Sequence, residues 1–386
     1  MTDGAASARI RRALALGTAL WVLPLLAVGV MVARDPAKRS VTPVFHLASQ
    51  RWWAGSDLYQ DPRGYHYLPQ FAIVFAPFHA LPAPAGDLLW RGLSVAAVLA
   101  GILAVARLAR PADAARTYAV AAALALAPCL GAVRNGQTNL AFGGLCLLLA
   151  AALSRERWRV AAACLVALVA VKPLGLVLVL LAPWTYPRLR LPLALGLALL
   201  AALPYLAANP SYATSQYRSA AAHLAGWSTT TESRFADLTA LLREAGLRLS
   251  SGAALALRAA AAVATFLLWL RAASRSREPF RALTLVLLAT VYLMLFNPMT
   301  EKNSYAIVAP ALGVAAALLL PAASTRAAGL FLGAVLLSVG VFPELFWRVS
   351  RDFGLWWDPL TIAAVAAILA SAIVRRGAVF ATAPAT

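Results

Sequence analysis

Long runs of apolar residues alternate with short polar segments along almost the whole chain. The runs fall at about residues 13–33, 68–82, 87–107, 117–133, 138–154, 159–184, 190–207, 252–273, 279–296, 304–321, 326–343 and 357–374. Most approach the roughly 20 apolar residues that a helix needs to cross the hydrocarbon core of a bilayer. The pattern predicts an all-α, polytopic membrane helix bundle with about 10 to 12 transmembrane helices.

Composition supports a single membrane domain. Of the 386 residues, 62% are hydrophobic and 13% are charged, and the mean hydropathy is +0.75. Little chain remains for a water-soluble domain once the apolar runs are assigned to helices. We therefore expect one integral membrane domain, residues 1–386, in which residues 13–320 form the main bundle and residues 321–386 add C-terminal helices.

The net charge of +19 does not point to nucleic acid as a partner. The basic residues form short clusters between apolar runs, which is the pattern of cytoplasmic loops and of loops that meet anionic lipids. All three cysteines (Cys129, Cys146 and Cys164) lie inside apolar runs, without a CxxC pair. They predict packing residues, and the sequence indicates neither a disulfide, a metal site nor a cofactor.

The basic clusters also predict an orientation. They include Arg9, Arg11 and Arg12 before an apolar stretch at 13–32, which we interpret as an uncleaved first helix with a cytoplasmic N-terminus. Five polar segments then share the extracytoplasmic face: residues 33–67, 134–139, 208–251, 297–303 and 343–358. We expect short amphipathic helices at 44–53, with Val44, Leu47, Ala48 and Trp52 on one side, and at 237–247.

This orientation requires two irregular segments. Residues 68–107 must cross once, and residues 159–184 must enter the membrane and return. Pro69, Pro77 and Pro82 interrupt the first, and Lys172 with Pro173 interrupts the second. The alternative is that both segments span normally and the charge pattern fails locally.

An ionisable residue at membrane depth is a functional candidate by default. Lys172 is such a residue, placed where it can hold an anionic lipid phosphate, although a lysine that snorkels to the surface is the alternative. The sequence Arg134-Asn135-Gly136-Gln137-Thr138-Asn139 packs a cation, amides and a hydroxyl between two apolar runs. Arg134 can contact the same phosphate, while Gln137 and Asn139 can bind sugar hydroxyls; a simple turn is the alternative.

Two further loops carry acids. The first loop contains Asp57, Tyr59, Asp61, His66 and Tyr67, in which a carboxylate can deprotonate a sugar hydroxyl and aromatic rings can contact a hexose. We favour Asp57 over Asp61 as a catalytic base.

The late loop, Asn297 to Asn303, offers Asn297 as a sugar ligand and Glu301 as a second acid. Lys302 completes the set as a phosphate contact, although a solvated hairpin explains this loop as well.

The arrangement resembles the membrane glycosyltransferases of the GT-C type. Within them it is similar to glycosyltransferase family 87, the polyprenyl-phosphate-mannose-dependent mannosyltransferase-like proteins of bacteria. The resemblance is carried by segments between about residues 10 and 310: Gly55-Ser56-Asp57-Leu58-Tyr59, Tyr67-Leu68-Pro69, Ala76-Pro77-Phe78-His79-Ala80-Leu81-Pro82, Gly136-Gln137-Thr138-Asn139-Leu140, Val171-Lys172-Pro173 and Asn297-Pro298.

The resemblance implies a polyprenyl-phosphate hexose donor, with mannose as the expected sugar, and a lipid or glycan acceptor. It also implies a bacterial inner membrane protein with an extracytoplasmic active site, and transfer with inversion by one carboxylate base. The family commonly places that acid before a Val-Tyr pair of the first-loop helix. Here the matching stretch, residues 39–45, contains no acid, so Asp57 or Glu301 must substitute, or transfer is lost.

Two rival functions use the same residues without breaking a bond. One is a transporter or flippase for a lipid-linked saccharide, and the other is a non-catalytic binding protein. The two halves of the sequence show no convincing internal repeat of the kind common in transporters. The sequence leaves the sugar, the acceptor, the linkage, metal dependence and the oligomeric state open.

Overall fold

The computed structural model describes residues 2–61, 64–228, 235–346, 348–350 and 352–380. These residues form helices and connecting segments and contain no strand, which confirms the predicted all-α membrane bundle. Within them, seven helices are long and apolar enough to cross a membrane: α1 (Thr2–Arg34), α5 (Ala83–Ala109), α6 (Ala114–Asn135), α10 (Arg190–Ala207), α13 (Ser251–Arg275), α16 (Arg326–Phe346) and α17 (Phe353–Arg376).

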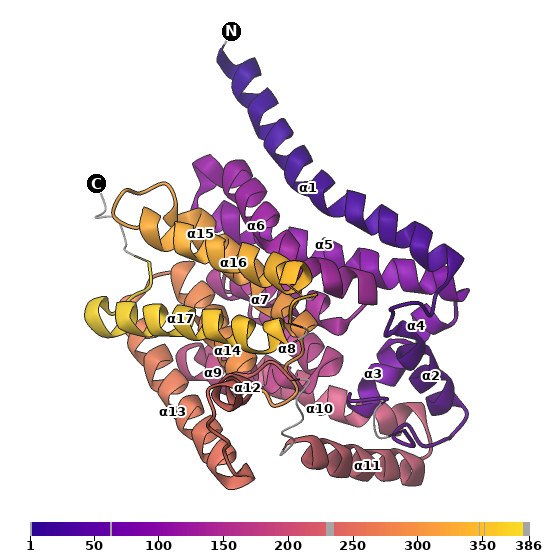
Figure 1. Cartoon of the computed structure of the whole chain (residues 1–386). Helices are drawn as coiled ribbons and strands as arrows, with labels where there is room; N and C mark the ends of the chain where they lie inside the picture. Colours follow the sequence, from indigo (N-terminus) through magenta and orange to yellow (C-terminus); the bar gives the residue numbers. More distant parts are fainter. Residues whose placement is uncertain (1, 62–63, 229–234, 347, 351, 381–386) are drawn as a thin grey trace.

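Five shorter apolar helices complete the bundle: α7 (Thr138–Ser154), α8 (Trp158–Val171), α9 (Leu176–Thr185), α14 (Phe280–Phe296) and α15 (Ala309–Leu319). Two of them form the centre of the core. Every residue of α15 is buried, and so are most residues of α14. A helix that is apolar on all sides is stable when other helices surround it. Figure 1 shows α14 and α15 within the bundle, with other helices beside them.

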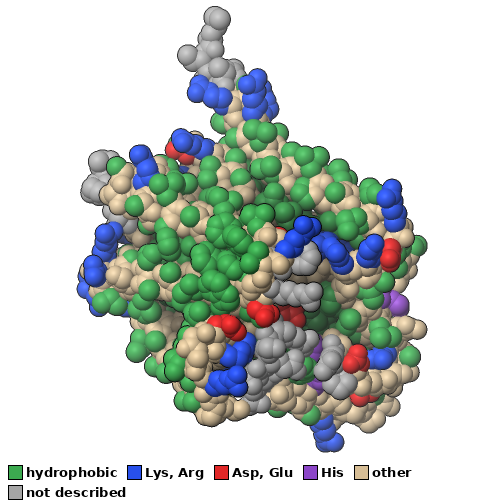
Figure 2. All heavy atoms as spheres, in the orientation of Figure 1, with side chains coloured by type: hydrophobic (Ala, Val, Ile, Leu, Met, Phe, Trp, Pro, Cys, Tyr) green, Lys and Arg blue, Asp and Glu red, His purple; other side chains and the backbone are tan. Residues whose placement is uncertain are grey.

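Hydrophobic side chains cover much of the visible surface, and Lys and Arg gather in separate clusters (Figure 2). Exposed leucines on α1, α10 and α13 reach 60% or more of their accessible area, as expected for lipid-facing positions. The apolar surface therefore agrees with a protein surrounded by lipid.

The segment from Trp158 to Tyr186 forms a hairpin that enters the bundle and returns. Its first arm, α8, breaks at Lys172, and the chain continues through the 3₁₀ turn η2 (Pro173–Gly175) into α9. The rings of Trp158 and Tyr186, at the two ends of the hairpin, lie 6.2 Å apart. With 14 residues, α8 is only about 21 Å long. The structure thus has the predicted return, with Lys172 at the tip.

The segment 68–82 likewise does not cross the bundle. It forms two short helices, α3 (Pro69–Val74) and α4 (Ala76–His79), which begin at or next to prolines. These helices pack beside α2 (Thr42–Trp53) before α5 begins. Residues 68–107 therefore cross once, as the sequence predicted.

The helix predicted at 44–53 is present as α2, but the prediction of its apolar face is partly wrong. Ala48 and Trp52 are buried, together with Phe45, whereas Leu47 is 43% exposed. The reason is that α2 packs against the aromatic residues Phe71, Phe75 and Trp90 through the Phe45 ring. The second predicted helix is present as α12 (Leu238–Glu244), capped by the Asp237 carboxylate.

Hydrogen bonds connect four of the five polar segments that were predicted to share one face of the bundle. An ion pair connects the fifth segment, 343–358, to the late loop. Hydrogen bonds join the first loop to the α6–α7 turn and to α11 (Pro210–Ser228), and a further bond joins residue 236 to the late loop. The ion pair links the late loop to the end of α16. The contacts are Val41–Asn135, Leu58–Gln216, Ala236–Thr300 and Lys302–Glu344. One end of the bundle thus gathers the candidate functional residues.

Candidate functional site

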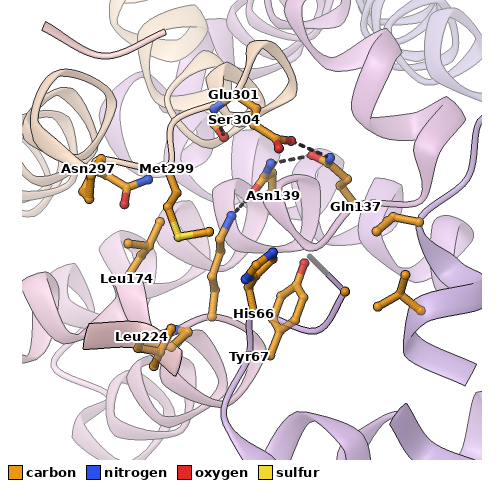
Figure 3. Close-up of a pocket in the computed structure, with 16 residues that line it drawn as sticks. His66, Tyr67, Gln137, Asn139, Leu174, Leu224, Asn297, Met299, Glu301 and Ser304 are labelled. Carbon is orange, nitrogen blue, oxygen red and sulfur yellow. Dashed lines mark hydrogen bonds between the residues drawn. The ribbon is translucent and has the colours of Figure 1, made fainter. Parts of the chain in front are cut away.

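A cavity of about 370 Å³ opens where these segments converge. Residues from five separate stretches line it: the first loop, the α6–α7 turn, the tip of the 158–186 hairpin, α11, and the late loop with the start of η4 (Lys302–Ile307). Its size lies within the usual range for small-molecule sites. Figure 3 shows Gln137 and Asn139 pointing toward Glu301, with His66 and Tyr67 on the other side.

A chain of polar contacts runs along one wall of the cavity. The Lys172 ammonium donates to Asn139 Oδ1 at 2.8 Å, and Asn139 Nδ2 donates to Gln137 Oε1 at 2.7 Å. Gln137 Nε2 then makes a long hydrogen bond of 3.5 Å to Glu301 Oε2. The wall therefore places a cation at one end, a carboxylate at the other and two amides between them.

Local backbone geometry fixes the Glu301 carboxylate. Glu301 caps η4: its side chain accepts from the backbone of Ser304, and its own N–H donates to the Ser304 hydroxyl at 3.1 Å. Such a reciprocal cap holds a carboxylate at a helix start. Glu301 also attracts Lys172 electrostatically. The cavity thus contains one anchored carboxylate opposite one cation.

The α6–α7 turn has its own support from α5. Gly136 adopts φ +66°, which allows the chain to turn directly after α6. The Arg91 guanidinium lies under this turn and donates to the carbonyls of Val133 and Arg134. Asp87 balances the Arg91 charge at 3.4 Å, and both side chains are 1% exposed. A buried ion pair thus holds the turn that presents Gln137 and Asn139.

The first loop closes the opposite side through aromatic and histidine contacts. His66 Nδ1 and His223 Nε2 lie 2.8 Å apart and share a hydrogen bond, which ties the loop to α11. Tyr67 accepts a hydrogen bond from Thr138 at 3.4 Å. Burial lowers the pKa of His223, and the Asp61 carboxylate opposes that shift. His66 and Tyr67 therefore face the cavity from a loop that α11 and α7 hold in place.

Comparison with known families gives one match. A model of glycosyltransferase family 87 matches residues 65–298, which is more than half of the chain. The chain belongs to glycosyltransferase family 87. Neither the curated proteins nor the solved structures contain a match to it.

The family 87 match covers most of the cavity. His66, Tyr67, Gln137, Asn139, Lys172 and Asn297 lie within the matched range, and all six line the cavity. Glu301 lies just beyond its end. The first-loop stretch at 39–45 contributes Val41 and Val44 to the lining. Glu301 is therefore the carboxylate that lines this cavity among the described residues.

Four residues singled out from the sequence lie away from the cavity lining. Asp57 is half-buried, and its Oδ1 accepts the Tyr59 N–H at 3.2 Å. Tyr59 is buried and donates to the backbone of Tyr67 at 2.7 Å, so it supports the loop from behind. Arg134 and Lys302 face a different groove. The structure thus separates these two cations from Lys172.

Sequence reasoning missed four contributors to the site: Ser304, which anchors Glu301, the Asp87–Arg91 pair, and His223. A signal for the pair was present, since two opposite charges four residues apart in an apolar run indicate a buried ion pair. His223 also escaped notice because it is far from His66 in sequence and carries no local pattern.

Proposed function

We propose that this family 87 glycosyltransferase transfers a hexose, with mannose as the expected sugar, from a polyprenyl-phosphate donor to a lipid or glycan acceptor. The donor class and the sugar come from the sequence resemblance. The observation that carries the proposal is the polar wall from Lys172 to Glu301. It provides a cation for a phosphate, a carboxylate for a hydroxyl and amides for the sugar between them.

The reaction that fits this wall is a single displacement. An acceptor hydroxyl attacks the anomeric carbon and passes its proton to the Glu301 carboxylate. The bond between that carbon and the phosphate oxygen breaks, so the new bond forms with inversion. The leaving polyprenyl phosphate takes the electron pair, and the Lys172 ammonium stabilises the charge that develops there.

Asn139 and Gln137 connect the two charged ends. Their amides have donors and acceptors that match sugar hydroxyls. Asn297, His66 and Tyr67 face the same space and complete a polar surface for a hexose. Because Asn139 also hydrogen-bonds Lys172, the sugar position is coupled to the phosphate position.

We assign the role of base to Glu301 rather than Asp57. Glu301 lines the cavity and is anchored by Ser304, whereas the Asp57 carboxylate is held by its own loop. A general base must reach the proton it removes. Glu301 lines the cavity and can meet this requirement, whereas the first-loop stretch at residues 39–45 contains no carboxylate.

The position of the cavity supports an extracytoplasmic site in the inner membrane. The helices α6, α8 and α14 end at the cavity and begin near Arg116, Arg157 and Arg277, at the opposite end of the bundle. Basic loops face the cytoplasm in most membrane proteins. The same rule gives a cytoplasmic N-terminus through Arg9, Arg11 and Arg12.

The experiment is a turnover assay with the full-length protein in liposomes. Polyprenyl-phosphate mannose and a lipid extract are supplied, and release of polyprenyl phosphate is followed over time. Glu301→Gln keeps the size of the side chain and an oxygen that can accept from the Ser304 backbone, but it removes the basicity. We expect kcat to fall by about 10²–10⁴-fold.

Asp57→Asn is the matched control, and its kcat should stay close to the wild type. Loss of turnover in Asp57→Asn with normal turnover in Glu301→Gln would transfer the role of base to Asp57. Donor binding by the wild type without release, across mannose, glucose and arabinose donors, would replace the enzyme by a binding protein. Movement of intact donor across the bilayer would indicate a flippase.

A further inference from the structure

A second groove, of about 330 Å³, lies between α1, α6 and α16. It shares no lining residue with the catalytic cavity. The two sites use opposite sides of the same segments: Gln137 and Glu301 face the cavity, whereas Arg134 and Lys302 face the groove. The chain thus presents a second charged site directly behind the first.

The groove is open to the lipid side of the bundle. Pro24, Val28 and Met31 line it from α1, and Val339 lines it from α16. Close to these positions, Leu26 on α1 is 61% exposed and Leu337 on α16 is 48% exposed. Such exposure on two apolar helices indicates contact with acyl chains.

Close packing closes the floor of the groove. At Gly340, a Cβ atom would lie 2.5 Å from Ala127, so the backbone of α16 rests directly on α6. Small residues allow membrane helices to approach in this way. The groove therefore has apolar walls from α1 and α16, and α6 forms its floor.

The polar end of the groove has a net positive charge. Lys302 Nζ pairs with Glu344 Oε1 at 2.6 Å. Arg134 is attracted to the same carboxylate, yet its buried Nε has no hydrogen-bond partner within the described part of the chain. Among the residues that line the groove, two cations and one carboxylate leave one positive charge uncompensated, and Arg39 adds a further positive charge near Glu344. This charge complements a ligand with a single negative charge.

We propose that the groove binds an anionic phospholipid, with its phosphodiester against Arg134 and Lys302 and an acyl chain along α1 and α16. A phosphodiester carries one negative charge, which matches the uncompensated charge of the groove. The guanidinium of Arg134 is suited to phosphate oxygens because it offers several donors in one plane. A phosphate in the groove can accept hydrogen bonds from the terminal N–H groups of the Arg134 guanidinium, and an acyl chain can pack against the apolar walls.

Occupancy of the groove has an effect on the cavity. Arg134 lies three residues before Gln137, across the turn at Gly136, and Lys302 directly follows Glu301. A lipid that holds both cations therefore holds both segments that form the polar wall. We expect anionic lipid to restrain Gln137 and Glu301 without entering the cavity.

Photocrosslinking of full-length protein in nanodiscs tests the site without any transfer reaction. The discs contain phosphatidylcholine and a small fraction of phosphatidylglycerol with a diazirine in one acyl chain. Labelled peptides are located by mass spectrometry. We expect adducts in residues 24–31 and 337–345, and at least about fivefold less labelling in Arg134→Gln, which corresponds to about 1 kcal/mol of lost binding.

Two variants separate binding from folding. Arg218→Gln removes an exposed arginine on α11, outside the groove, and should leave labelling unchanged. Met31→Trp fills the groove without changing its charge, and Met31 is 42% exposed, so the fold tolerates the larger ring. We expect Met31→Trp to reduce labelling as Arg134→Gln does.

Three results would overturn the proposal. The first is equal labelling by a phosphatidylcholine probe, which would mean that charge plays no part. The second is labelling that neither Arg134→Gln nor Met31→Trp changes. The third is competition by polyprenyl phosphate but not by unlabelled phosphatidylglycerol, which would assign the groove to the donor. Because labelling needs no turnover, a failure of the proposed glycosyl transfer would leave this result intact.

Discussion

Asp87 and Arg91 form an ion pair, 3.4 Å long, that is fully buried on α5 one helical turn apart. The Thr42 hydroxyl donates to the Asp87 carboxylate at 2.6 Å. His46 Nε2 lies 2.9 Å from the other oxygen of the same carboxylate. Arg91 in turn holds the end of α6. The pair therefore links the interfacial helix α2, the crossing helix α5 and the turn that carries Gln137.

Removal of one partner of this pair should destabilise the protein strongly. In Asp87→Ala, the Arg91 guanidinium stays buried without its counter-charge, and we expect a loss of about 3–5 kcal/mol. Thermal unfolding in detergent measures the change. The control is Glu156→Ala, which breaks an exposed 3.6 Å pair with Arg188 and should cost less than about 1 kcal/mol. Equal shifts in the two variants would contradict the role of burial.

Gly136→Ala should disturb the cavity as well as the fold. A Cβ at this position would lie 2.6 Å from Thr42 Cγ2 and 2.9 Å from Arg91 Cζ. Gly246 also has a positive φ, but a Cβ there meets nothing within 4 Å. Both substitutions introduce backbone strain of about 1–2 kcal/mol. Only Gly136→Ala should also raise KM for the donor, and a similar KM in both variants would refute the clash.

Lys172→Gln should weaken donor binding selectively. The glutamine can still hydrogen-bond Asn139, but the cation is lost, and a charge-assisted hydrogen bond contributes about 1.5–3 kcal/mol. We expect KM for the polyprenyl-phosphate donor to rise by about 10–100-fold. Lys38→Gln, at an exposed position of the first loop, is the control and should behave as the wild type. An unchanged KM in Lys172→Gln would remove Lys172 from the phosphate site.

The attachment of the first loop to α11 should weaken in acid. Burial lowers the pKa of His223 below its ordinary value of 6.5, against the opposing effect of Asp61. The unfolded state then binds the proton more readily than the folded state, so stability falls as the pH drops through about 6.5. The hydrogen-exchange protection of residues 64–68, measured relative to the intrinsic exchange rate at each pH, should fall accordingly.

His223→Gln provides the test of cause, because glutamine can hydrogen-bond His66 but does not titrate. The pH dependence of exchange at residues 64–68 should diminish in this variant. The pair His46–His79 lies on α2 and α4, outside the measured segment, so its titration does not enter the readout. Exchange that keeps its full pH dependence in His223→Gln would point to another group.

The apolar runs were sufficient to predict the helices, and the basic clusters between the runs predicted which segments meet at one end of the bundle. It also located the break at Lys172, because a cation and a proline in succession cannot continue an apolar helix. These features depend on residues close together in the sequence. The pattern of apolar runs therefore gives the architecture and the re-entrant hairpin.

The direction of individual loop side chains was beyond this reasoning. Lys302 and Glu301 are neighbours, yet one turns to Glu344 and the other to Gln137, each through a contact far away in sequence. Arg134 and Lys172 likewise face different sites although both were natural phosphate ligands. Which of two adjacent polar residues reaches a cavity depends on tertiary hydrogen bonds, and local patterns do not encode them.

In the cavity, Lys172 hydrogen-bonds the Asn139 amide, and this bears on the release of product in the proposed reaction. In the cavity the ammonium rests on the neutral Asn139, so an arriving phosphate breaks no ion pair. A polyprenyl-phosphate sugar is a diester with one negative charge, whereas the released polyprenyl phosphate is a monoester with about −1.5 to −2 at neutral pH. The same cation therefore attracts the product more strongly than the substrate. For the proposed donor we therefore expect inhibition by the released lipid phosphate, and we expect its departure to limit turnover.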